Sequence, residues 1–190
     1  MARPAGPGRK ALIEAGFTLA EEQGIGGLSV NAVTSTASMA KGSFYQHFPD
    51  RRSYLIELHR HYHDELEATV LAAVDGLDPG MARLRAGLPA FLDGCLRTRG
   101  TKALLAQARS ETDLGEEVSI RNARFAALIE QDLAAIGWDP AAPVAALAVA
   151  MAADISFHEL RDRRPLEDLR GALLAIVENP VSLGAYPRAL

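Results

Sequence analysis

The sequence is poor in cysteine and has neither long uninterrupted apolar runs nor alternating β-branched segments. The single Cys95 excludes a disulfide framework and a zinc site built from several cysteines, and it suits a reducing compartment. No uninterrupted apolar run approaches the roughly 20 residues of a membrane span. No hydrophobic stretch follows the charges of residues 1–10, so a signal peptide is not expected. We therefore expect a soluble cytoplasmic protein with no membrane segment.

The composition is that of a globular protein. Of 190 residues, 48% are hydrophobic and 23% are charged, which is enough apolar surface for a real core. The formal net charge is −4, but it is uneven, because residues 1–52 are mildly basic and the remainder is acidic. This asymmetry favours a front segment that binds a polyanion and a body with another task.

Helical periodicity dominates, and no strand pattern competes with it. Glycine and proline divide the chain into about nine segments, so the predicted fold is all-α. The predicted helices span residues 9–23, 29–36, 40–47, 50–74, 81–99, 101–112, 116–136, 140–163 and 166–178.

The two short helices at 29–36 and 40–47, joined by a short turn, have the arrangement of a helix-turn-helix, whose second helix enters the DNA major groove. Apolar residues stand where such a motif needs a buried side: Val30, Val33, Ala37, Met39, Phe44 and Phe48. The outer face of the second helix carries hydrogen-bonding side chains and a glycine: Lys41, Gly42, Ser43, Tyr45, Gln46 and His47. Such a mixture is typical of contacts to base edges and phosphates.

Residues 24–30 (GIGGLSV) and 40–51 (AKGSFYQHFPDR) resemble the N-terminal domain of the TetR family of transcriptional regulators. The resemblance covers about residues 9–58. It implies an N-terminal helix-turn-helix domain, residues 1–48, followed by a helical ligand-binding and dimerisation domain, residues 49–190. The implied function is sequence-specific DNA binding that represses transcription and is relieved by a small apolar effector, with no catalytic chemistry and no cofactor.

The resemblance also implies roles for single residues. Ser29 and Asn31 would contact the DNA backbone or nearby bases, and Arg51 would hold a phosphate where the family usually has lysine. The recognition face would consist of Lys41, Gly42, Ser43, Tyr45, Gln46 and His47. The sequence departs from the family pattern at Thr34, which replaces alanine, at Ser38, which replaces the turn glycine, and at Ala40, which replaces a polar cap.

Two further features of the body are expected. The resemblance implies an apolar cavity bordered by the fourth to eighth helices, and we place Phe91, Cys95, Phe125 and Met151 in its wall. The alanine-rich helix at 140–163 and the apolar stripe of the helix at 166–178 predict a homodimer that reads a palindromic operator in double-stranded DNA. Alternatively, both helices bury these stripes against their own subunit.

Two other classes of function remain open on the sequence. His59, His61 and His63 cluster on one helix, and the i,i+4 pair His59 and His63 has the spacing for a shared metal in a helical enzyme. However, no Cys or His partner is evident on a second helix, so we interpret the cluster as a solvated, weakly basic face. The other alternative is a helical protein-interaction module that binds no DNA.

Overall fold

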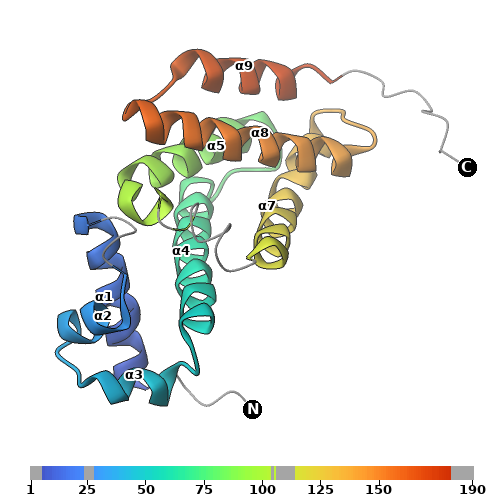
Figure 1. The fold of residues 1–190 in the computed structure, drawn as a ribbon. Helices are drawn as coiled ribbons and strands as arrows, with labels where there is room; N and C mark the ends of the chain where they lie inside the picture. The colour runs from blue at the N-terminus through green and yellow to red at the C-terminus, as the bar shows by residue number, and fades with distance from the viewer. Residues whose placement is uncertain (1–5, 24–27, 104, 106–113, 181–190) are drawn as a thin grey trace, which may run out of the picture. The chain divides into compact units, whose positions relative to one another are not determined.

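The computed structural model describes residues 6–23, 28–103, 105 and 114–180, and all regular secondary structure in these ranges is helical (Figure 1). This confirms the predicted all-α class. The helices are α1 (Pro7–Gln23), α2 (Val30–Thr36), α3 (Lys41–His47), α4 (Arg51–Ala73), α5 (Met81–Arg97), α7 (Gly115–Ala135), α8 (Ala141–Asp162) and α9 (Glu167–Glu178). Of the helix predicted at 101–112, residues 101–103 are helical, and most of the remainder lies outside the described residues.

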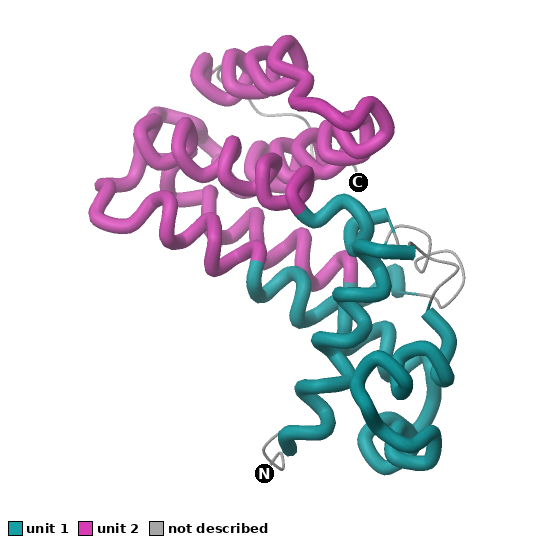
Figure 2. Tube along the Cα trace, turned by 90° about the vertical axis from the view of Figure 1, so that its left-hand side faces the viewer, with its two compact units in different colours: residues 1–65, 98–117 teal, residues 66–97, 118–190 magenta. Residues whose placement is uncertain are grey.

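The chain forms two compact units (Figure 2). Unit 1 contains residues 1–65 and 98–117, and unit 2 contains residues 66–97 and 118–190. Helix α4 contributes its first part to unit 1 and its last turns to unit 2. The predicted division after residue 48 concerns function, and it stays a prediction.

In unit 1, helices α1, α2 and α3 pack against one another around an aromatic core. The rings of Phe44, Phe48 and Tyr54 meet with centroids 5.0–5.5 Å apart, and all three side chains are buried. The Tyr54 hydroxyl donates a hydrogen bond to the carbonyl of Leu12 at 2.9 Å, and burial raises the pKa of Tyr54. These contacts join α3 and the start of α4 to α1.

The ends of the short helices follow from local chemistry. Ser29 caps α2, since its hydroxyl accepts a hydrogen bond from the Ala32 amide at 3.1 Å, whereas Ala40 gives α3 no side-chain cap. Ser38 has a φ of 54°, the left-handed conformation in which glycine is the unstrained residue. Asp50, directly before α4, accepts a hydrogen bond from the Ser53 amide, and this bond lowers the pKa of the Asp50 carboxyl.

In unit 2, helices α5, α8 and α9 pack together, and α8 and α9 lie side by side (Figure 1). Their buried apolar residues form one core with parts of α7 and with Trp138. An ion-pair cluster ties the three helices, because the buried Arg170 on α9 contacts the buried Glu159 on α8 at 2.5 Å and the partly exposed Asp93 on α5 at 2.6 Å. The Glu159 carboxylate also accepts a hydrogen bond from the Leu166 amide.

Helix α8 corrects one sequence expectation. An 18-residue window of α8 has a mean hydropathy of 1.5, so by length and composition alone this helix meets the criterion for crossing a membrane. A search for uninterrupted apolar runs missed it because the helix is rich in alanine and carries a few polar residues. The core helix of a soluble protein has the same length and composition, and Ala145, Ala148, Ala152 and Ile155 pack into the core of unit 2.

Candidate functional site

Helix α3 presents a polar outer face in unit 1. Phe44 points into the aromatic core and is fully buried, whereas Lys41, Gly42, Tyr45 and Gln46 are exposed. The Tyr45 side chain is 54% exposed while the edge of its ring still meets Phe44, with centroids 5.4 Å apart. A side chain of this kind adds little to the core and remains available to a partner.

Two of the predicted recognition residues, Ser43 and His47, are only partly exposed. The start of α1 covers part of His47, because a Cβ on Gly8 would lie 2.6 Å from the Nε2 atom of His47. The imidazole therefore rests against the backbone of α1. This contact limits the reach of His47 toward a partner and gives it a share in positioning α3.

Arg9 is a positioning residue that the sequence analysis did not single out. Its Nη1 donates to the His47 carbonyl at 2.9 Å, and its Nη2 lies 3.1 Å from a carboxylate oxygen of Glu57. The guanidinium also stacks 4.4 Å above the ring centroid of Phe48. Arg9 thus joins α1 to the C-terminal end of α3 and to α4. In the sequence, Arg9 is only one basic residue at the start of the helix predicted at 9–23, and nothing there distinguishes it.

The remaining predicted DNA contacts lie on unit 1 and are exposed: Ser29, Asn31 and Arg51. Arg51 stands at the first residue of α4, and its Nε lies 3.5 Å from the carbonyl of Leu28, directly before the α2 cap. Thr34 is buried and donates its hydroxyl to the Val30 carbonyl at 2.9 Å. The hydroxyl at this position therefore stays within α2 and is satisfied there.

The interpretation of the histidine cluster as a solvated face was wrong. His59 is fully buried, His63 is 6% exposed, and their ring centroids lie 4.3 Å apart on α4, whose face at this point is covered by protein. His61 remains exposed and pairs with Glu57. Among the described residues, no group of three His, Cys, Asp or Glu side chains has the arrangement of a metal site.

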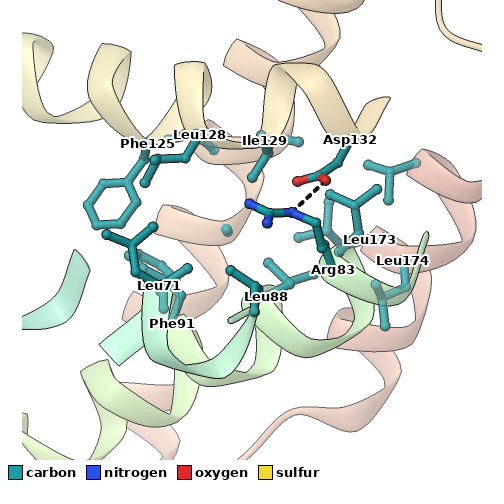
Figure 3. Close-up of a pocket in the computed structure, with 18 residues that line it drawn as sticks. Leu71, Arg83, Leu88, Phe91, Phe125, Leu128, Ile129, Asp132, Leu173 and Leu174 are labelled. Atoms are coloured by element: carbon teal, nitrogen blue, oxygen red, sulfur yellow. Dashed lines mark ion pairs between the residues drawn. The ribbon is translucent and has the colours of Figure 1, made fainter. Parts of the chain in front are cut away.

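Unit 2 contains an apolar cavity lined from helices α4, α5, α7, α8 and α9, together with Val74 just after α4 (Figure 3). About 80 Å³ of it is open to the centres of water-sized molecules, several times the space that one water needs. Phe91 and Phe125 meet edge to face at one side of it, with centroids 5.4 Å apart. Arg83 and Asp132 point toward each other at another side and form an ion pair of 2.9 Å.

The cavity wall agrees only in part with the residues predicted for it. Phe91 and Phe125 line the cavity, as expected, whereas Cys95 and Met151 do not. Cys95 is buried elsewhere in the helix packing, and Met151 lies partly buried against the core of unit 2. Helix α9, which the prediction left out, supplies Leu173, Leu174 and Val177. Periodicity gives the apolar face of a helix but not which of its residues border a void.

Comparison with known proteins gives a family match within unit 1. Residues 12–58 match the family described as bacterial regulatory proteins, tetR family. A curated relative, the HTH-type transcriptional repressor DhaR of Mycobacterium sp. (strain GP1), is 29% identical over 96 residues, which are 47% of this chain and 48% of that protein. The chain therefore matches about half the length of this relative.

Solved structures extend the likeness over most of the chain. A transcriptional regulator from Rhodococcus sp. RHA1 has a TM-score of 0.71 and 24% identity, covering 88% of this chain and 92% of that one. A TetR-family transcriptional regulator from Rhodococcus sp. also has a TM-score of 0.71 and 24% identity, covering 90% and 97%. A TetR-like transcriptional regulator from Rhodococcus sp. RHA1 has a TM-score of 0.69 and 16% identity, covering 93% of this chain and 96% of that one. At these identities the likeness concerns the fold.

Proposed function

The chain belongs to the TetR family of bacterial regulatory proteins, and from this membership we propose that it represses transcription by binding a specific operator and leaves it when an effector binds. The family consists of regulators and not enzymes, in agreement with the sequence-based expectation. We also propose that the protein is soluble and cytoplasmic. Residues 1–48 bind DNA in this proposal, and residues 49–190 bind the effector and dimerise.

The observation that carries the DNA-binding proposal is the outward polar face of α3 above a packed aromatic core. Lys41, Tyr45 and Gln46 project from a helix whose inner residue, Phe44, is held by the rings of Phe48 and Tyr54. A helix presented in this way fits the major groove, where side chains read base edges. Ser29, Asn31 and Arg51 are suited to phosphate contacts that set the register.

We assign the base and backbone contacts to the predicted set. Lys41, Gly42, Ser43, Tyr45, Gln46 and His47 form the recognition face, with His47 in a secondary role because it rests against α1. Arg51, at the start of α4, offers a fork of donors to a phosphate. A single short helix reads only a few base pairs, so two copies on a palindromic operator are needed for specificity.

The cavity in unit 2 is the proposed effector site. It is bordered almost wholly by apolar side chains, and a small hydrophobic molecule would bury its surface there. An effector that prefers the conformation with lower operator affinity shifts the population toward it, and the coupling is reciprocal. Phe91 and Phe125 are the aromatic wall residues of this proposal.

The test is fluorescence anisotropy with a labelled duplex from the region upstream of its own gene, beside a scrambled duplex of equal length. A specific regulator binds the upstream duplex roughly a thousandfold or more tightly, and its affinity falls steeply with salt. Equal affinity for both duplexes contradicts an operator. No binding to either duplex would favour a protein-interaction module instead.

The metal-dependent alternative has a separate test. Dialysed protein is analysed for bound zinc by atomic emission, with a His59→Gln/His63→Gln variant beside it. Stoichiometric zinc that the variant loses would support the alternative. The regulator proposal predicts less than one zinc per ten chains, a level on the order of adventitious binding.

A further inference from the structure

The cavity in unit 2 has an unusual distribution of charge. Of the 18 residues that line it, 16 are apolar or glycine, and the two charged ones are Arg83 on α5 and Asp132 on α7. Figure 3 shows the ion pair between these two side chains, with the Phe125 ring at the opposite side of the cavity. The cavity therefore has a polar end and an aromatic end.

The two charges at the polar end compensate each other. Arg83 Nε lies 2.9 Å from Asp132 Oδ1, and the side chains are 16% and 4% exposed. The same oxygen accepts a hydrogen bond from the Gly80 amide at 3.0 Å, and Arg83 Nη1 donates to the Leu77 carbonyl at 3.3 Å. The polar end is thus neutral as a whole and firmly held.

This neutrality decides which ligands fit. A carboxylate that approaches Arg83 also approaches the negative charge of Asp132, and an ammonium group that approaches Asp132 meets the positive charge of Arg83. Neither ion recovers the free energy of leaving water, because the rest of the wall is hydrocarbon. A neutral oxygen, by contrast, accepts a hydrogen bond from the guanidinium without disturbing the ion pair.

We propose that the cavity binds an uncharged, mainly hydrocarbon molecule with one hydrogen-bond-accepting oxygen, which lies at Arg83 while the hydrocarbon part packs against Phe91 and Phe125. This inference rests on the proposed function, whose effector site it describes. Arg83 is the residue that orients the ligand. Asp132 excludes anions by holding the guanidinium in a neutral pair.

The experiment uses three probes of equal chain length at pH 7: nonan-2-one, nonanoate and nonylammonium. Binding to the full chain is followed by the fluorescence of Trp138, the single tryptophan, and by calorimetry. Trp138 donates its Nε1 hydrogen to the carbonyl of Val177, which lines the cavity, so its emission reports occupancy. We expect the ketone to bind roughly tenfold or more tightly than either ion.

Asp132→Asn tests the role of the ion pair. The amide oxygen still accepts a hydrogen bond from the Gly80 amide, but the negative charge is gone, so Arg83 becomes an uncompensated cation. We expect nonanoate to gain at least about tenfold in affinity and to overtake the ketone. Asp154→Asn on α8, an exposed carboxylate outside the cavity wall, is the matched control and should leave the order of the probes unchanged.

The outcomes separate this inference from the proposed function. Equal or tighter binding of nonanoate by the wild-type chain, no binding of any probe, or an unchanged order in a folded Asp132→Asn variant overturns the inference. If Asp132→Asn does not fold, the wild-type order of the three probes decides alone. Ketone binding that leaves operator affinity unchanged supports the inference and contradicts effector release. Operator release by nonanoate would support effector release and contradict the inference about the ligand.

Discussion

Arg9 has three contacts that fix the end of α3. It bonds the His47 carbonyl, pairs with Glu57 and stacks on Phe48, so truncation removes a charged hydrogen bond and a cation–π contact together. We expect Arg9→Ala to lower the free energy of unfolding by roughly 1–3 kcal/mol in urea denaturation. Lys10→Ala is the control, since that side chain is 76% exposed and pairs with the exposed Glu14 at 3.6 Å, and it should change stability by less than about 0.5 kcal/mol. Equal effects of both substitutions would contradict the positioning role.

Lys41 and Tyr45 are exposed side chains on the outer face of α3. We expect Lys41→Ala and Tyr45→Ala to weaken operator binding while the urea midpoint changes little. Loss of a base contact costs roughly 1–3 kcal/mol, whereas loss of a phosphate contact reduces the salt slope by about one. Anisotropy titrations at several salt concentrations distinguish the two, with Arg161→Ala in unit 2 as a control for the removal of one positive charge. Unfolding by Tyr45→Ala, with full binding by Lys41→Ala, would show that the assigned face is wrong.

At this scale the sequence predicts exposure better than contact. The outward positions of Lys41, Gly42, Tyr45 and Gln46 follow from helical periodicity around the buried Phe44. The contact of His47 with Gly8, and that of Arg9 with the His47 carbonyl, join residues 38 or 39 positions apart in the chain. No local pattern contains such a contact, because it depends on how α1 crosses α3.

The two short helices of unit 1 differ in their caps. Ser29 caps α2, whereas Ala40 occupies the N-cap of α3 in the extended conformation (φ −69°, ψ 146°) that a capping side chain needs. We expect Ala40→Ser to raise, and Ser29→Ala to lower, the free energy of unfolding by about 1 kcal/mol each. Urea denaturation followed by circular dichroism measures both. A destabilising Ala40→Ser would mean that α3 begins at another residue.

Arg170 holds helices α5, α8 and α9 together in unit 2. Its partner Glu159 is 1% exposed, so removal of the guanidinium leaves a buried carboxylate without its counter-charge. We expect Arg170→Met to cost about 3–5 kcal/mol and the double variant Arg170→Met/Glu159→Leu to recover much of this loss. Arg85→Ala, which breaks the exposed pair with Glu178, should have little effect. If Arg170→Met alone changes the free energy of unfolding only slightly, the ion-pair cluster adds little to the stability of unit 2.

Helix existence and ends could be predicted from the sequence, but the role of each helix face could not. Glycine, proline and caps mark the ends to within a few residues, as for α1 at Gln23 and α9 at Glu178. In α8 the alanines divide: Ala145, Ala148 and Ala152 are buried in their own core, whereas Ala146 and Ala150 are exposed. Alanine carries no periodic contrast that would separate these faces in advance.

At the scale of the whole chain, the cavity also shows how little of the tertiary packing can be predicted from the sequence. Phe91 and Phe125 were placed in the wall of the cavity that the family resemblance implies, and both line it. Its polar end was not predicted, since Arg83 and Asp132 lie 49 positions apart and each resembles an ordinary surface charge. Voids and ion pairs of this kind come from tertiary packing, which helical periodicity does not specify.

The proposed homodimer depends on apolar residues that the chain does not bury itself. On α8, Leu147 is 63% exposed, and on α9 Leu169 and Ile176 are 40% and 52% exposed. Leu173, which belongs to the same predicted stripe, is 2% exposed and lines the cavity, so a charge there would damage the subunit itself. Ile176 and Leu147 are therefore the positions at which a dimer can be tested without disturbing the core.

We expect light scattering at micromolar concentration to give about twice the chain mass for the wild type, and Leu147→Glu or Ile176→Glu to lower it toward 20.3 kDa, because a buried charge without a partner opposes association. Gln131→Glu, on an exposed position of α7, adds the same charge and should remain dimeric. The dissociated variants should bind a palindromic operator weakly, since two recognition helices must reach half-sites separated by a multiple of about 34 Å. A wild-type monomer that binds this operator at full affinity would overturn the dimer, and it would leave the exposed leucine and isoleucine side chains to another partner.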